Sequence, residues 1–297
     1  MLLFKMTRGS TPRTKPLNMK AIILPFVALL SIAAPAQDLP QPSPQGAVEQ
    51  TIGLTRVKVE YSRPSVKGRS IFGDLVPYGK LWRTGANQNT TIEFSGPVKL
   101  ADQDVAAGKY SLFTTPNEGV WVVHLNKNTE LWGEEDYKEE ETVVSLKVEA
   151  TPAELTETLT MEFADLSGDN GALVIRWEKT KVTLPIVTDA TEQGLANIKE
   201  ALAKPDAKAG AYGSSARFCL DRNVMSKEAL AWAGKSVSME KKFWTLHTLA
   251  RAQAANGMMK EAIATAEESM KMAQEEKNEA YIKMNREKIE EWTKAGK

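Results

Sequence analysis

The chain has 297 residues, of which 42% are hydrophobic and 26% are charged, so it can bury the core of one large or two modest globular domains. Its formal net charge is zero, but residues 1–36 hold five basic and no acidic residues, which leaves 33 basic and 38 acidic residues in the remainder. A remainder with a net charge of about −5 lacks the basic excess of nucleic-acid-binding proteins, so we expect no nucleic-acid partner.

The N-terminus has the pattern of a secretory signal peptide. After Met19 a lysine precedes an apolar run, residues 21–34, and an Ala-Pro-Ala sequence ends at Ala36. This order predicts a signal peptide over residues 1–36, with an extended basic start and cleavage after Ala36. The run is short for a membrane span and Pro25 interrupts it, which favours a signal peptide over an anchor helix. We expect a periplasmic or secreted protein with no membrane span after cleavage.

The cysteine content agrees with a bacterial exported protein. Cys219 is the only cysteine, so no intrachain disulfide can form. Such a protein must be stable through its core alone, which is less typical of small secreted domains of eukaryotes.

A linker and then a strand-forming region follow. Residues 37–46 are rich in Pro, Gln and Ser and predict a linker. Residues 48–186 alternate between apolar and polar side chains, which is the pattern of strands with one buried face. Near the start of this region Val57, Val59 and Tyr61 fall on one face, and charged residues between them fall on the other.

The alternation continues along the chain in residues 109–115, 120–126, 141–150, 157–163 and 172–186. A Thr-Pro-Asn-Glu-Gly loop separates the first two of these runs and predicts a hairpin. Roughly nine or ten short strands indicate a mainly antiparallel β-sandwich, which we place at residues 47–188.

The period changes after Thr188. Residues 190–296 are rich in Ala, Lys, Glu and Met and predict four or five helices, so an all-α domain over residues 189–297 completes an α+β protein. Residues 223–239 align with residues 256–272 at an offset of 33, with Asn, Lys-Glu-Ala, Ser and Met in register. This period is close to that of a tetratricopeptide unit, so we expect a repeat-like domain that binds a protein partner.

Motifs for catalysis and cofactor binding are scarce. His124 and His247 are the only histidines, and no His-x-x-x-His or Cys-x-x-Cys pair offers zinc ligands. The sequence has no Gly-x-Ser-x-Gly elbow, no Walker loop and no dinucleotide-binding glycine motif. We therefore expect no cofactor and no metal, and we favour a protein that is not an enzyme.

Paired carboxylates are the one catalytic resource in the sequence. The densest acidic group consists of Glu134, Glu135, Asp136, Glu139, Glu140 and Glu141. A glycosidase needs two carboxyls across a cleft, one of them with a raised pKa. Calcium binding is a second interpretation, although the Asp-rich loop of known calcium sites is absent. We favour a solvated turn between strands.

Residues 61–91, called the hallmark segment below, follow neither the two-residue alternation of a strand nor the period of a helix. They carry five basic residues against one acid, Asp74. Arginine forks bind carboxylate, sulfate or phosphate, and aromatic faces suit sugar rings or flat organic acids. Alternatively, these side chains bond to the backbone and clamp a long connection in place. The candidate ligand-binding residues are Tyr61, Arg63, Lys67, Arg69, Tyr78, Trp82, Arg83, Asn87 and Asn89.

Residues 61–87 read YSRPSVKGRSIFGDLVPYGKLWRTGAN and resemble the signature of the bacterial domain of unknown function family numbered 2911. The AGKYSLF run that ends at Phe113, the strand around Trp121 and the Trp-Gly pair at Trp132 fit the same family. The resemblance covers about residues 43–188. It implies an exported β-rich domain, found mainly in Bacteroidetes and often followed by a helical tail, and it implies no activity and no catalytic residue.

The sequence thus predicts a binding or interaction module of the bacterial envelope that takes a small anionic or glycan ligand. The alternative is a glycan-acting hydrolase with two carboxyls facing each other beside Arg63 or Arg83. We expect Trp82 to enter the core, because it is large and a strand follows it closely. Arg83 then either bonds to carbonyls or to an acid such as Asp74, or it contacts a ligand in a wet cleft.

Overall fold

The computed structural model describes residues 1, 3 and 39–295. The predicted cleavage site after Ala36 and the apolar run before it lie outside the described residues, so export stays a prediction. No helix in the described part of the chain is long and apolar enough to cross a membrane.

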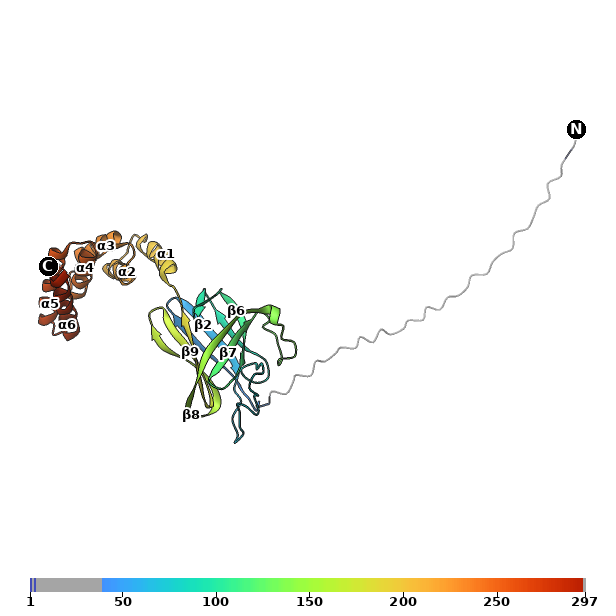
Figure 1. Cartoon of the computed structure of the whole chain (residues 1–297). Coiled ribbons are helices and arrows are strands. Elements are labelled where there is room, and N and C mark those ends of the chain that lie inside the picture. Colours follow the sequence, from blue (N-terminus) through green and yellow to red (C-terminus); the bar gives the residue numbers. More distant parts are fainter. Residues whose placement is uncertain (2, 4–38, 296–297) are drawn as a thin grey trace. The chain divides into compact units, whose positions relative to one another are not determined.

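Nine strands within residues 39–295 form one antiparallel sheet in the order β1-β2-β3-β6-β7-β8-β9-β4-β5 (Figure 1). The strands are β1 (Gln45–Ile52), β2 (Thr55–Ser62), β3 (Thr90–Phe94), β4 (Val98–Leu100), β5 (Gln103–Val105), β6 (Gly108–Thr115), β7 (Val120–Asn126), β8 (Thr142–Ser167) and β9 (Asn170–Val187). The first part of β8 pairs with β7 and its second part with β9. Buried side chains of both sections form one hydrophobic core, as expected for a sandwich.

The alternation read from the sequence is confirmed in β2. Val57, Val59 and Tyr61 are buried, while Arg56 on the opposite face is exposed. The predicted hairpin is also confirmed, because β6 and β7 pair across the Pro116–Gly119 loop.

One strand differs from the prediction. The sequence indicated separate strands at residues 141–150 and 157–163, but β8 runs through both without a break. The register between β8 and β9 shifts between Pro152 and Thr156. Proline lacks the N–H that the ladder needs, so Pro152 interrupts the pairing and the alternation without ending the strand.

In the described part of the chain, six α-helices follow the strands where four or five were expected: α1 (Thr191–Leu202), α2 (Ala209–Asp221), α3 (Ser226–Met239), α4 (Phe243–Ala255), α5 (Met259–Glu275) and α6 (Glu279–Ala295). The break between α3 and α4 contains neither Gly nor Pro. Thr245 makes it instead, because its hydroxyl accepts from the Lys242 N–H at 3.0 Å and donates to the Glu240 carbonyl at 2.9 Å.

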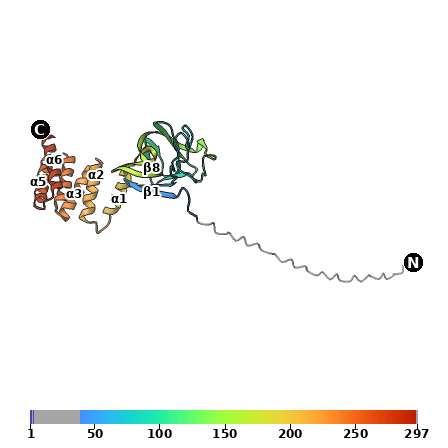
Figure 2. The ribbon, with the colours of Figure 1, turned by 90° about the horizontal axis from the view of Figure 1, so that it is seen from below.

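The sequence repeat corresponds to equivalent positions in α3 and α5. Ala229, Ala233 and Ser236 in α3 are buried, and so are their counterparts Ala262, Ala266 and Ser269 in α5. The Ser236 hydroxyl donates to the Ala209 carbonyl at the start of α2, and the Ser269 hydroxyl donates to the Phe243 carbonyl at the start of α4. Figure 2 shows successive helices side by side. This packing supports a helical repeat, and the tetratricopeptide likeness remains a prediction.

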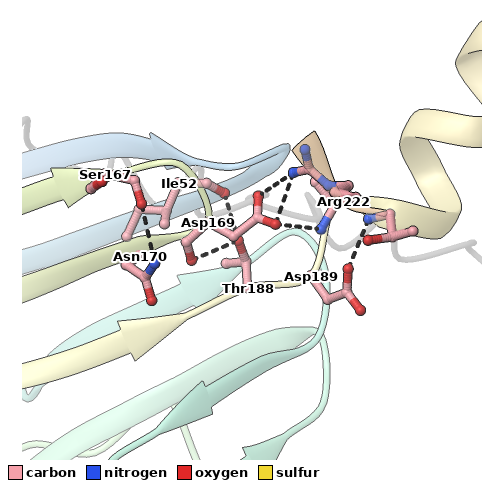
Figure 3. A network of polar contacts seen from close by, with 9 residues as sticks. Ile52, Ser167, Asp169, Asn170, Thr188, Asp189 and Arg222 are labelled. Carbon is pink, nitrogen blue, oxygen red and sulfur yellow. Dashed lines mark hydrogen bonds and ion pairs between the residues drawn. The ribbon is translucent and has the colours of Figure 1, made fainter. Parts of the chain in front are cut away.

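A polar cluster lies where the strands give way to the helices (Figure 3). Asp169, in the turn between β8 and β9, accepts two bonds from the Arg222 guanidinium, at 2.9 and 2.8 Å. That guanidinium lies 4.1 Å from the Phe218 ring centre. Thr188 donates to the Asp169 carbonyl, so this turn is fixed from two directions. The division into two domains at residue 188 stays a prediction.

Candidate functional site

The hallmark segment distributes its candidate residues over three pockets and a set of structural contacts. Arg69, Trp82 and Arg83 line a pocket of about 370 Å³, called the arginine pocket. A second pocket of about 350 Å³, called the polar pocket, is lined by Tyr61 and Asn89, and a third of about 400 Å³ by Tyr78. Arg63, Lys67 and Asn87 line none of these three pockets.

Arg63 and Asn87 contact the protein itself, as the clamp interpretation expects. Arg63 donates from Nε to the Leu159 carbonyl at 3.1 Å and from Nη2 to Thr160 Oγ1 at 3.0 Å, which ties the segment to β8. Asn87 has a left-handed backbone, with φ at 59°, and its amide donates to the Ser43 carbonyl at 3.2 Å. Asn tolerates this conformation better than most residues.

Lys67 and Arg69 are held through the backbone. The Lys67 N–H donates to Glu157 Oε1 at 2.9 Å, while its side chain points to solvent as an exposed residue. Arg69 donates to the carbonyls of Val66 and Ser65, at 3.0 and 2.6 Å. Arg69 therefore stabilises the backbone of its own loop and also places a positive charge at the arginine pocket.

The prediction that Trp82 enters the core is confirmed. Its ring stacks on Trp177 of β9 with centres 5.6 Å apart, and it meets the rings of Trp121 and Phe72 edge-on. Its indole N–H donates to the Gly85 carbonyl at 3.0 Å, and its backbone pairs with Thr114 of β6. These contacts fix one wall of the arginine pocket.

Arg83 binds an acid, but the acid is Glu134 rather than Asp74. Arg83 Nη1 lies 3.0 Å from each Glu134 carboxylate oxygen, and the Arg83 backbone N–H donates to the same carboxylate at 3.0 Å. Most of the acidic run is exposed as a solvated turn predicts, while Glu134 is half-buried. Gly133, with φ at 88°, turns the chain toward Arg83.

Two donors at this pocket lack acceptors. The Trp177 indole N–H and Arg83 Nε are buried and have no hydrogen-bond partner among the described residues. Both residues line the arginine pocket, and Trp177 is only 2% exposed. A buried donor without an acceptor costs about 1–3 kcal/mol, so two on one pocket require an explanation.

Apolar side chains form about half of the pocket wall around these donors. Pro64, Leu75, Val76, Pro77 and Leu81 line the pocket, and its charged members are two arginines and Glu134. The lining therefore has an excess of one positive charge. The pocket thus combines two arginines and two unpaired donors with several apolar side chains.

Thr84 holds the loop of the pocket in a strained conformation. Its φ is 55°, which is uncommon for a β-branched residue and costs of the order of 1–3 kcal/mol. The residue is fully buried, its hydroxyl meets Thr114 Oγ1 at 3.1 Å, and its carbonyl accepts from Thr90 at 2.9 Å. These bonds hold residues 82–90 in one shape, so the arginine pocket is preformed.

Residues 43–186 match the family model described as Protein of unknown function (DUF2911). This part of the chain, just under half of its length, resembles the DUF2911 family. The resemblance seen in residues 61–87 is thereby confirmed, with a C-terminal limit two residues before the expected one. Searches among curated proteins and among solved structures found no match.

The DUF2911 segment contains all nine candidate residues, together with Trp177, which no sequence pattern singled out, and Glu134, which was assigned only to the acidic run. Trp177 lies in β9, 86 positions after the end of the hallmark segment, and no local pattern joins the two. Glu134 was obscured by the five other acids of its run. Only the pairing of distant strands brings these residues to one pocket.

The two histidines lie apart from the pockets. His124, in the DUF2911 segment, contacts the hydroxyls of Thr115 at 3.0 Å and Ser145 at 2.9 Å, and burial lowers its pKa. His247 bonds to Asn285 among the helices. Among the described residues, the hydrogen bonds of both histidines go to hydroxyl and amide groups, and no group of three His, Cys, Asp or Glu is arranged to hold a metal ion.

Proposed function

We propose that this protein is a binding module of the bacterial envelope whose arginine pocket takes a small ligand with an oxyanion and an apolar body. The oxyanion is a carboxylate, sulfate or phosphate. The observation that carries the proposal is the pair of buried donors without acceptors, the Trp177 N–H and Arg83 Nε, on residues that line one pocket.

The chemistry of the pocket supports an oxyanion. Its oxygens accept several hydrogen bonds at once, and bonds to a charged group are stronger than bonds between neutral groups. Glu134 occupies the Nη1 edge of Arg83, so a ligand would use the Nε edge. Arg69 supplies the second positive charge, and the apolar walls would cover the rest of the ligand.

The alternative, a glycan-acting hydrolase, depends on paired carboxylates. The arginine pocket has one acid, Glu134, and Arg83 already pairs with it. The polar pocket has two, Glu60 and Glu130. Hydrogen bonds from Lys58 and Lys109 lower the pKa of Glu60, whereas a general acid needs a raised pKa. The geometry therefore supports binding better than hydrolysis.

The binding proposal is tested with matched pairs of small probes on the chain from residue 37 onward. Benzoate and benzamide share a shape and differ in charge, and phenyl sulfate and phenyl phosphate extend the series. We expect calorimetry to show binding of one or more anions and none of benzamide. Trp177→Phe removes the N–H donor and keeps a smaller aromatic ring, so it should weaken anion binding by about tenfold, equivalent to the loss of one such bond.

The matched control is Trp121→Phe, which alters a buried tryptophan of the same aromatic cluster that does not line the arginine pocket. Equal anion binding by the wild type and Trp177→Phe would overturn the proposal, and so would the absence of anion binding across the series.

Export is part of the same proposal and has its own measurement. The pattern of residues 1–36 supports cleavage after Ala36 and a periplasmic or secreted location. Mass spectrometry of the protein from its native host should find a chain that begins at Gln37. A mature chain that keeps Met19 would contradict export by this route. The protein partner expected for the helical repeats stays a prediction.

A further inference from the structure

The polar pocket differs in kind from the arginine pocket. It lies over β1, β2, β3 and β6 and is closed by residues that precede β3 and follow β7. Every residue that lines it carries nitrogen or oxygen in its side chain, including Gln45, Gln88, Asn89 and Thr91. Such a lining offers donors and acceptors together and no apolar enclosure, which suits a ligand rich in hydroxyl groups.

The polar pocket has no excess of positive charge. Glu60 bonds to Lys58 at 2.8 Å and to Lys109 at 3.0 Å, so its carboxylate is already compensated. Of these two lysines only Lys109 lines the pocket, and Glu130, the remaining acid of the lining, is exposed. The lining therefore has one lysine against two glutamates and offers no free cation to an anion. A neutral ligand fits this lining.

An exposed tryptophan lies opposite one residue of the polar pocket. Trp132 is 68% exposed, the highest fraction among the large hydrophobic residues in 39–295. Its backbone forms an antiparallel bridge with Gln88, which lines the pocket. Residues directly opposite in such a bridge place their side chains on the same face. The Trp132 ring therefore lies on the face where Gln88 enters the pocket.

The backbone that carries Trp132 is held on both sides. The Asn89 N–H donates to the Leu131 carbonyl at 3.2 Å, and the Leu131 side chain is buried. Glu134, two residues after Trp132, is held by its ion pair with Arg83. With Leu131 turned inward and Glu134 paired, the exposed position of Trp132 is imposed by the fold.

We infer that the polar pocket and Trp132 together form a binding site for a neutral saccharide, separate from the oxyanion site. A pyranose ring has an apolar face of C–H groups and an edge of hydroxyls. The indole face would cover the former, and the amides of Gln88 and Gln45 and the hydroxyl of Thr91 would bond to the latter. Both side-chain types required lie on one surface.

The test measures binding of neutral disaccharides to the chain from residue 37 onward, with maltose, cellobiose, lactose and diacetylchitobiose as probes. We expect at least one to bind, and Trp132→Ala to weaken it by about tenfold or more, because truncating an aromatic contact of this kind costs at least 1.4 kcal/mol. Trp132→Phe should retain most of the affinity, because it keeps an aromatic face. Gln88→Ala should weaken binding by a smaller factor.

Two controls separate the sites and the causes. Trp244→Ala alters an exposed tryptophan of α4 and should leave saccharide binding unchanged. Trp177→Phe should reduce anion binding and leave saccharide binding intact, so the two proposals fail independently. The inference is overturned if no neutral disaccharide binds, or if Trp132→Ala binds as tightly as the wild type, as it would if Trp132 instead contacted a protein.

Discussion

The strand-rich region and the helical region fill their interiors with different side chains. Between the strands, the large residues Trp121, Trp177, Phe94 and Phe113 are fully or almost fully buried. Between the helices of the described chain, eight alanines are fully buried: Ala216, Ala229, Ala233, Ala250, Ala252, Ala262, Ala266 and Ala273. Sections of sheet stand about 10 Å apart and need bulk to fill the space, whereas helices with small contact residues approach closely.

This difference implies opposite sensitivities. The strand-rich region should be damaged most by loss of volume, because its large side chains leave cavities when truncated. The helical region should be damaged most by added volume, because its close contacts leave no room.

Trp82→Ala should have the largest effect on stability. It removes a ring that stacks on Trp177 and contacts Trp121 and Phe72, together with the bond to the Gly85 carbonyl. We expect a loss of about 3–5 kcal/mol in the free energy of unfolding, measured by urea denaturation. Trp132→Ala, an exposed tryptophan, should change it by less than about 0.5 kcal/mol. Equal losses would show that burial does not set the cost.

Ala266→Leu tests the helical side of the comparison. Ala266 of α5 is fully buried in a cluster with Ala250, Ala262 and Trp292, so the larger side chain must push helices apart. We expect a loss of about 1–3 kcal/mol. Ala264→Leu in the same helix is exposed and controls for helix propensity, which leucine and alanine share closely. If both variants have the same free energy of unfolding, the helix contacts around Ala266 are not tight.

The fold was predictable where local rules decide it. Alternation identified β2 and the β6–β7 hairpin, and the 33-residue offset identified equivalent positions in α3 and α5. The prediction failed where a local break has no strong signal. The alternation breaks between residues 150 and 157, which predicted two strands where β8 is continuous, and the gap between α3 and α4 depends on one threonine, Thr245.

The candidate site was predictable only in part, because three of the residues that line the arginine pocket, Ser43, Glu134 and Trp177, lie outside the hallmark segment. The hallmark segment supplied Arg69, Trp82 and Arg83, and local composition found them. Glu134 and Trp177 complete the pocket through the pairing of β9 with β8 and the turn at Gly133. No spacing rule in the sequence relates these positions, so three-dimensional contact had to reveal them.

Arg63→Ala should cost less than either core change, because hydrogen bonds at a half-buried site are lost rather than volume. Arg63 links the hallmark segment to the Leu159 carbonyl and the Thr160 hydroxyl. We expect a loss of about 1–2 kcal/mol in urea denaturation. Lys67→Ala is the matched control, because only its backbone is bonded, and it should change stability by less than about 0.5 kcal/mol. An unchanged Arg63→Ala would show that the clamp contributes nothing.

The smallest expected effect concerns pH and belongs to the helical region. His247 donates from Nδ1 to Asn285, whose amide donates to Ser269, and Ser269 donates to the Phe243 carbonyl. Burial lowers the pKa of His247, and Arg251 and Lys288 lower it further, while the bond to Asn285 opposes them. The folded protein therefore favours the neutral ring more than the unfolded chain does.

A histidine whose folded pKa lies below its unfolded value of about 6.5 makes the unfolded state bind more protons as the pH falls. The stability from His247 is therefore complete above about pH 6.5 and is lost as the pH falls from there toward the lowered pKa. His247→Gln should flatten the dependence of unfolding free energy on pH in this window, measured by urea denaturation at several pH values. His124→Gln is the control, because burial lowers that pKa too, in the strand-rich region. Hydrogen exchange should show that acid loosens α4–α6 in the wild type and loosens these helices less in His247→Gln. The same acid sensitivity of these helices in both proteins would contradict this account.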